Sequence, residues 1–449
     1  MRALIERLGR SLALGGVLLV MGAAGAGPAA AATGDTVRAS LDAAGQQFAG
    51  ASDRPAISQT GQFVAFDAGG HVFLRDLTAG ITTQVDVSSG GVPAVGGTSD
   101  SPSVSADGRE IVFVSRATNL TPDPANGRSQ VFLRDVRNSH LPRTVRLSER
   151  RVAGQVEAGR ADSFAPQISP DGLHVVWNSA SDNLVPTTGS GTFQQVYGFE
   201  VATGTLSMVS RNSLGDRGNG DSSGASVDDS GRFVAFTTGA HNLSATLVHA
   251  EDVARVDRDT NVDGILDEPG ATQTTAVARN AAGQLANDSS SLASISADGR
   301  FVTFSTRATN MGAGLGGNTT GGYVRDLGIP NVTTIALTVP AGELQAGDAV
   351  GGMSLSGDGT RAALSMLRIV HTGPRPQDVD ITELCFVRDT AARTTVRADA
   401  TQGTDSDGSL CEGAVISRDG RFVAFGSNGT NLFVPDHNGA TEDVYRHEL

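Results

Sequence analysis

The stretch PSVSADGREIVFVSRATNL, from Pro102 to Leu120, recurs along the chain and decides the fold. Four gapless copies are PQISPDGLHVVWNSASDNL (Pro166 to Leu184), ASVDDSGRFVAFTTGAHNL (Ala225 to Leu243), ASISADGRFVTFSTRATNM (Ala293 to Met311) and AVISRDGRFVAFGSNGTNL (Ala414 to Leu432). Shorter or edited copies begin at Pro55 and Met353. Seven copies of one unit, spaced 47 to 68 residues apart, indicate a repeat architecture.

Each unit has the pattern of four short strands. An Asp-Gly pair such as Asp107-Gly108 separates the first two strands, and this pair favours a tight hairpin. A third strand such as QVFLRDV and a fourth such as TVRLSER follow, each alternating apolar and polar residues. Seven four-stranded units of this length predict an all-β fold, a seven-bladed β-propeller that spans residues 33–449.

The two ends of the repeat array complement each other. The seventh unit stops at Leu449 after its third strand, EDVYRHEL. At the other end, DTVRASLDAAGQ (Asp35 to Gln46) resembles the fourth strand and linker TVRLSERRVAGQ (Thr144 to Gln155). We therefore expect a strand at about residues 35–41 to complete blade 7, which removes an open sheet edge. The alternative, a linear stack, requires polar capping units at both ends, and the sequence shows none.

The first 32 residues predict a secretory signal peptide. Arg2, Arg7 and Arg10 precede the apolar run SLALGGVLLVMG, and small residues follow up to Ala32. The run is too short to span a bilayer, so we expect no transmembrane anchor after cleavage, with a retained anchor as the alternative. The protein is therefore predicted to be secreted or periplasmic. Its formal net charge of -14 is a poor match to a nucleic-acid partner.

Two cysteines, Cys385 and Cys411, are expected to form a disulfide in an oxidising compartment, with two separate buried thiols as the alternative. A literal G-x-S-x-G occurs from Gly220 to Gly224. A nucleophile elbow needs a strand before it and a helix after it, whereas this motif is interpreted as a turn in a blade linker. We therefore assign no catalytic residue.

An acidic insertion in the fourth unit, VDRDTNVDGILDEPG (Val256 to Gly270), predicts a calcium site. Oxygen-bearing side chains alternate along it, and Gly264 allows a sharp turn. The predicted ligands of a structural Ca²⁺ are Asp259, Asn261, Asp263, the carbonyl group of Ile265, and Asp267. The alternative is a solvated acidic hairpin that binds no ion. A second metal site at Asp436, Asn438 and Asp443 is left open, because these residue types are also ordinary turn formers.

The motif xxISxDGRxVxFxS, followed by a VFxRD strand, resembles the repeats of TolB-like (WD40-like) propellers of the bacterial cell envelope. The resemblance extends from Asp35 to Leu449 and implies the propeller fold without the N-terminal α/β domain that TolB carries. The acidic insertion is similar to the calcium loops on propeller hairpins of integrin α chains.

These observations favour a monomeric, non-catalytic binding or scaffold propeller whose partner is a protein or glycan of the cell envelope. The alternative is a propeller enzyme that acts on a polysaccharide, as a lyase or hydrolase, with its site at the channel mouth. An enzyme should show a deep axial pocket with converging titratable groups, whereas a scaffold should show a shallow or plugged channel.

Overall fold

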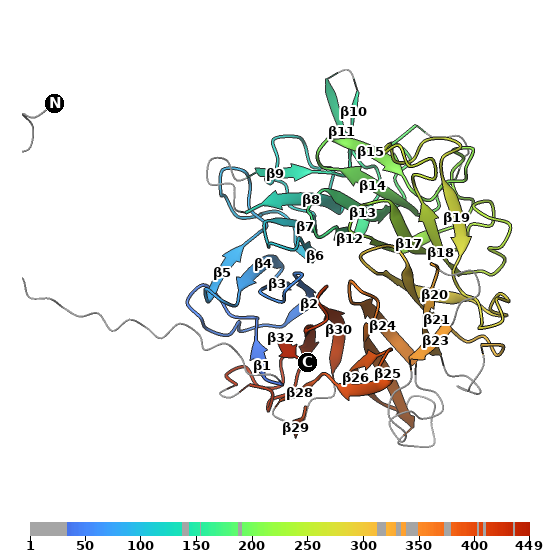
Figure 1. Ribbon diagram of the computed structural model, residues 1–449. Helices are drawn as coiled ribbons and strands as arrows, with labels where there is room; N and C mark the ends of the chain where they lie inside the picture. Colours follow the sequence, from blue (N-terminus) through green and yellow to red (C-terminus); the bar gives the residue numbers. More distant parts are fainter. Residues whose placement is uncertain are drawn as a thin grey trace, which may run out of the picture.

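The computed structural model describes residues 34–136, 143–152, 154–186, 191–311, 320–328, 334–337, 349–371, 379–401, 404–406, 410–433 and 436–449. Regular secondary structure within these ranges is entirely β, and seven four-stranded antiparallel sheets form a ring (Figure 1). The all-β, seven-bladed prediction is confirmed. The predicted signal peptide, residues 1–32, lies outside the described residues.

The seven blades and two linker hairpins have the following bounds. Blade 1 holds β2 (Ser52–Ile57), β3 (Phe63–Ala68), β4 (His71–Asp76) and β5 (Ile81–Gln84), and blade 2 holds β6 (Ser99–Val104), β7 (Glu110–Ser115), β8 (Gln130–Asp135) and β9 (Arg143–Arg146). Blade 3 holds β12 (Ser163–Ile168), β13 (His174–Ser179), β14 (Gln195–Glu200) and β15 (Thr205–Met208), and blade 4 holds β16 (Ser222–Val227), β17 (Phe233–Thr238), β18 (Asp252–Asp257) and β19 (Gln273–Ala276). Blade 5 holds β20 (Ser290–Ile295), β21 (Phe301–Thr306), β22 (Gly321–Asp326) and β23 (Thr334–Leu337), and blade 6 holds β24 (Ala349–Leu355), β25 (Arg361–His371), β26 (Val379–Asp389) and β27 (Thr394–Arg397). Blade 7 holds β30 (Cys411–Ile416), β31 (Phe422–Ser427), β32 (Asp443–Glu448) and β1 (Thr36–Arg38). The linker hairpins are β10 (Glu149–Val152) with β11 (Gln155–Ala158), and β28 (Ala400–Thr401) with β29 (Thr404–Asp405).

The N-terminal strand closes the ring as the sequence predicts. Strand β1 is the outermost strand of blade 7, and Thr36 lies opposite His447 in the antiparallel register. The strand is shorter than residues 35–41, because the backbone N–H groups of Ala39 and Ser40 both donate to the carbonyl oxygen of Val444. The chain then turns within the linker to blade 1, where an isolated β-bridge joins Leu41 to Gln47.

The Ser-x-Asp-Gly motif builds the turn between the first two strands of a blade. In blade 2 the Ser105 hydroxyl donates to Asp107 at 2.9 Å and accepts from the backbone N–H of Glu110 at 3.0 Å. Gly108 has φ +69°, and a Cβ there would overlap the ring of Phe63 in blade 1. The glycine is therefore needed both for its backbone conformation and for the close approach of two blades.

The Asn-Leu pair that ends the motif fixes the loop between the second and third strands. The Asn119 amide donates to the carbonyl oxygen of Pro93 at 2.8 Å and accepts from the N–H of Val95 at 2.9 Å. Matching contacts to the preceding linker recur at Asn183, Asn242 and Asn310. One side chain thus holds a loop and a linker together in each of these blades.

The core lies between neighbouring sheets rather than within one. A typical cluster joins Phe63 and Leu74 of blade 1 to Ile111, Phe113 and Phe132 of blade 2. Antiparallel strands place the first turn and the loop between strands three and four on one face of the ring, which we call the turn face. The opposite face, formed by the linkers and the loops between strands two and three, is called the linker face.

Candidate functional site

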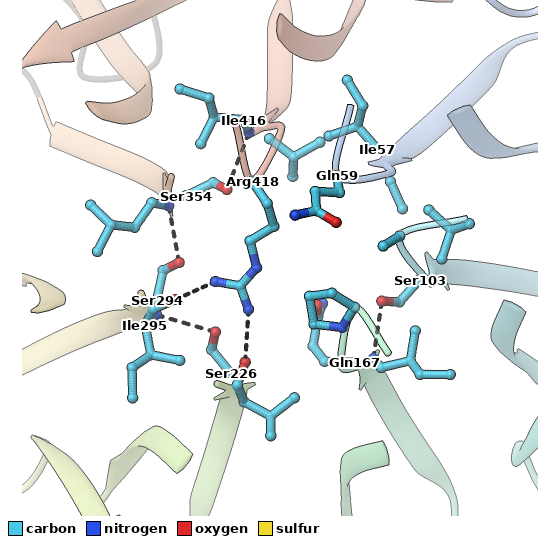
Figure 2. Close-up of a pocket in the computed structure, with 18 of the residues that line it drawn as sticks. Ile57, Gln59, Ser103, Gln167, Ser226, Ser294, Ile295, Ser354, Ile416 and Arg418 are labelled. Atoms are coloured by element: carbon cyan, nitrogen blue, oxygen red, sulfur yellow. Dashed lines mark hydrogen bonds between the residues drawn. The ribbon is translucent and has the colours of Figure 1, made fainter. Parts of the chain in front are cut away.

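The ring encloses an axial cavity of about 140 Å³ that is lined by the innermost strands (Figure 2). Serine hydroxyls on these strands accept hydrogen bonds from the innermost strand of the next blade. The bonds are Ile168 N–H to Ser103 at 3.1 Å, Ile295 N–H to Ser226 at 3.2 Å, Leu355 N–H to Ser294 at 3.1 Å, and Ile416 N–H to Ser354 at 3.2 Å. The polar lining therefore holds the blades together around the axis.

Arg418 crosses the channel at the turn face. Its guanidinium group donates to the carbonyl oxygens of Ile295 at 3.0 Å and Val227 at 3.1 Å (Figure 2). It also lies 3.2 Å from the Asp229 carboxylate. Burial lowers the pKa of Arg418, and burial raises the pKa of Asp229. Residues of blades 4, 5 and 7 are thus tied together at this end of the channel.

The cavity offers hydrogen bonds and one positive charge. Among the described residues that line it, Arg418 is the charged one, and its partner Asp229 lies outside the lining. Acid-base or nucleophilic chemistry needs a pair of such groups within hydrogen-bonding distance. The described part of the lining contains no such pair.

The linker-face mouth of the channel carries a ring of β-bulges that the sequence analysis missed. Each innermost strand breaks register with its neighbour near this mouth. Positive φ angles occur at Arg54, Ser101, Ala165, Gly224, Leu292 and Gly413. Non-glycine residues in this conformation are strained, and such strain often marks binding surfaces. Only the glycines Gly224, Gly351 and Gly413 give a hint of these bulges in the sequence.

The predicted calcium loop follows β18 on the turn face, and three of its predicted ligands lie together. The Asp259 carboxylate accepts from the backbone N–H groups of Asp263 at 3.2 Å and Gly264 at 3.0 Å. The Asn261 amide donates to Asp263 at 2.9 Å, and the N–H of Ile265 donates to the same carboxylate at 2.9 Å. The chain thus folds around these side-chain oxygens, and calcium binding stays a prediction.

Asp267, the fifth predicted ligand, is held by Arg258. The Arg258 side chain is 1% exposed, and its Nη2 lies 2.5 Å from Asp267 and 3.1 Å from Glu200 of blade 3. Burial alone would lower the pKa of Arg258, but the charges on Asp267 and Glu200 outweigh burial and raise it. Ser207 also donates to Asp267 at 2.5 Å. The sequence analysis assigned no role to Arg258, whose partner from blade 3 is 58 residues away.

The second candidate set, Asp436, Asn438 and Asp443, surrounds the side-chain amide of Gln47. This nitrogen donates to Asp436 at 2.9 Å and to Asp443 at 2.6 Å, and it also contacts Asn438. Arg38 lies 3.4 Å from Asp443 and 3.5 Å from Asp436. These oxygens therefore bind the N-terminal segment to blade 7.

The remaining sequence motifs have structural roles. Cys385 and Cys411 form the expected disulfide. The G-x-S-x-G interpretation needs correction, because Ser222 and Ser223 begin β16 and do not lie in a linker. The Ser222 hydroxyl is buried and forms a hydrogen bond with Thr238 at 2.8 Å. The sequence pattern assigns the motif to a linker because the inner strand begins earlier than the alternation of its residues suggests.

Solved structures similar to this chain include TolB from Acinetobacter baumannii, with 14% identity, a TM-score of 0.38, and coverage of 78% of this chain and 63% of that one. A putative TolB from Agrobacterium tumefaciens has 12% identity and a TM-score of 0.38, with 89% and 91% of the two chains covered. The tricorn protease has 11% identity and a TM-score of 0.49, with 94% of this chain and 34% of that chain covered. Structural neighbours of the chain are thus TolB-like propellers. This chain spans less than two thirds of the first and third of these proteins.

No family model matches the sequence, and no curated protein matches it. The described residues contain no helix long and apolar enough to cross a membrane.

Proposed function

We propose that this protein is a non-catalytic binding propeller that works in the cell envelope or the medium. The observation that carries the proposal is Arg418, which projects into the channel at the turn face and binds blades 4 and 5, beside a small cavity whose described lining holds no acid-base pair. The ring then serves as a rigid frame, and recognition falls to its faces.

The linker face is the proposed binding face. Its loops are held in place by asparagine side chains such as Asn119, and its channel mouth carries the strained bulges. It also exposes apolar side chains, with Leu214 80% exposed and Phe164 44% exposed. A preorganised surface with isolated apolar anchors suits a protein or a glycan, because little ordering entropy is lost on binding.

Two further features support an extracytoplasmic location and a role for calcium. The Cys385–Cys411 disulfide is the kind of bond that persists in oxidising compartments. The loop oxygens of Asp259 and Asp263 would hold Ca²⁺ together with Asn261 and the Ile265 carbonyl group, whereas Asp267, the fifth predicted ligand, is paired with Arg258. Such an ion would rigidify the turn face of blade 4, opposite the proposed binding face.

The test compares one apolar residue on each face. Leu214→Asp alters the linker hairpin before blade 4, whereas Leu173→Asp alters the turn of blade 3 and is the matched control. The purified wild-type protein and both variants are applied to a glycan array and used to capture envelope proteins, and each hit is then remeasured with purified material. We expect Leu214→Asp alone to weaken binding at least tenfold. Equal loss in Leu173→Asp, or turnover of a polysaccharide by the wild-type protein, contradicts the proposal.

A further inference from the structure

Four carboxyl groups meet where blade 7 packs against blade 1. Asp53 on β2 is the register partner of Asp67 on β3. Asp53 lies beside Glu412 of β30 and Glu442, which immediately precedes β32, and Asp67 lies near Glu442. Carboxylate oxygens of Asp53, Glu412 and Glu442 all lie within 4.8 Å of one another. We call these four residues the seam carboxyls. They come from both sides of the joint that closes the ring.

A glycine brings two of the seam carboxyls together. Gly426 on β31 is the register partner of Glu412, and a Cβ at Gly426 would overlap the carboxyl group of Glu442. The side chain of Glu442 therefore lies across the strand, with its carboxyl group within 4.8 Å of that of Glu412. A hydrogen bond between two carboxyl groups requires a proton on one of them, because an ionised carboxylate only accepts.

The surroundings favour protonation. Oε1 of Glu442 and Oδ1 of Asp67 are buried without a hydrogen-bond partner. The cation that faces the group is Arg54, whose half-exposed side chain lies 3.4 Å from Asp67. The other charged neighbours, Asp100 on β6 and Glu383 on β26, are acidic.

Burial and neighbouring carboxylates act in the same direction on these groups. Burial, followed by the charges of Asp53 and Glu412, raises the pKa of Glu442 to about 8. Burial also raises the pKa of Asp67 to about 7, although Arg54 opposes it. The pKa of Glu412 is raised by burial and by Asp53. At neutral pH the seam therefore retains protons that ordinary carboxyl groups would have lost.

The other described blade interfaces do not repeat this arrangement. The carbonyl oxygen of Glu442 accepts from the N–H of Ser52, and the residues with the equivalent bond are Gly70, Ser129, Gln194 and Glu251. The positions equivalent to Asp67 hold Val114, Asn178, Thr237, Ser305 and Gly426. The blade fold itself therefore does not require a group of carboxyls at this place.

We propose that the seam carboxyls make the joint between blades 1 and 7 a proton-dependent clasp. When they share protons, a carboxyl group of one blade can donate to a carboxylate of the other, because Asp53 lies within 4.8 Å of Glu412 and Glu442. When they are fully ionised, like charges from both blades repel each other across the joint where the two ends of the chain meet.

The direction of the pH effect follows from linkage. A carboxyl group that holds its proton more tightly in the folded state than in the unfolded chain makes the folded state bind more protons. The stability that the clasp contributes is thus greatest below about pH 4, the ordinary pKa of a carboxyl group in the unfolded chain. It declines as the pH rises from about 4 to about 8, and it is absent at higher pH.

Glu442→Gln tests the clasp, because it removes the ionisation but keeps a hydrogen-bonding group of similar size. Glu251→Gln is the matched control at the equivalent position of blade 4. Melting temperatures of the wild-type protein and both variants are measured by calorimetry from pH 4.5 to pH 9. We expect the wild-type and Glu251→Gln curves to fall together as the pH rises, and the Glu442→Gln curve to fall less, with a difference of a few degrees at pH 9.

Two results would overturn the proposal. One is a Glu442→Gln curve parallel to that of the wild-type protein. The other is a rise in melting temperature on addition of CaCl₂ at pH 9 that persists in Asp263→Ala and disappears in Glu442→Gln. That result would mean that the seam carboxyls bind a cation in place of protons. Should Glu442→Gln fail to fold, Glu412→Gln gives the same comparison from the neighbouring carboxyl group.

Discussion

Gly61 of blade 1 lies against the ring of Phe422 in blade 7, so closely that a Cβ at residue 61 would overlap the ring. The Arg446 guanidinium lies over the same Phe422 ring, 4.4 Å from its centroid. It also donates to the carbonyl oxygen of Gly61 at 3.2 Å. Gly108 makes the same contact with Phe63 at the next interface. On the turn face, the closing joint is thus packed like a joint between consecutive blades.

Gly61→Ala is expected to destabilise the protein through both backbone strain and overlap. The φ of +71° alone costs about 1 to 2 kcal/mol for a residue with a Cβ, and forcing Phe422 aside adds roughly 1 to 3 kcal/mol. Gly204→Ala is the control, because Gly204 has φ +70° and open space around it. Urea denaturation measures both variants. Equal losses of unfolding free energy would show that the close packing at the closing joint adds nothing.

Deleting residues 35–46 should expose an edge of blade 7 and cause aggregation. The deletion removes the strand paired to β32, the Arg38 contacts to Asp443 and Asp436, and the Ser40 hydrogen bond to Asp443. An unpaired strand edge is a template for pairing with another chain. Size-exclusion chromatography with light scattering, together with calorimetry, tests this expectation. A monomeric deletion variant with an unchanged melting temperature would show that β1 does not close the ring.

The local parts of this fold could be predicted from the sequence because one sequence unit is repeated seven times. The repeats locate the strands, the Asp-Gly pairs locate the turns, and the incomplete last unit locates the closure. Such features depend on residues within one blade, or on the fact that a ring has a first and a last member. The innermost strands were less well placed, since their bulges interrupt the alternation that identifies a strand.

Contacts that depend on the ring geometry could not be predicted in this way. Arg418 reaches Val227, which is 191 residues away, and Glu412 meets Asp53 from the other end of the chain. Each of these residues is an ordinary polar residue in its own segment. Arg258 shows the same difficulty inside the predicted calcium loop, because its partner Glu200 belongs to another blade.

Removal of the disulfide should lower the stability without changing the fold. The bond joins Cys385 and Cys411 across 26 residues, and closing a loop of this size stabilises a protein by about 3 kcal/mol in the chain-entropy model. We therefore expect the Cys385→Ser/Cys411→Ser variant to melt below the oxidised protein and to be insensitive to dithiothreitol. A double variant that melts with the oxidised protein would mean that the bond contributes nothing to stability.

Asp267 and Asp263 should separate the structural role of the acidic loop from its proposed role in calcium binding. Asp267→Asn leaves the buried Arg258 with Glu200 alone, so we expect a loss of about 3 to 5 kcal/mol both in EGTA and in CaCl₂. Asp263→Asn breaks no buried ion pair and should leave the stability in EGTA nearly unchanged. It should abolish a calcium-dependent gain of about 1 to 3 kcal/mol, the gain given by ligand at ten to a hundred times its dissociation constant.

Calorimetry of the wild-type protein and both variants, each with and without the ion, gives the decisive comparison. A wild-type melting temperature that does not respond to CaCl₂ means that the loop binds no calcium, and the Arg258–Asp267 pair then accounts for its order alone. A calcium response that survives in Asp263→Asn but is lost in Asp267→Asn would instead mean that the ion displaces Arg258. That outcome would restore Asp267 to the ligand set, because a carboxylate freed from its guanidinium partner can bind the metal.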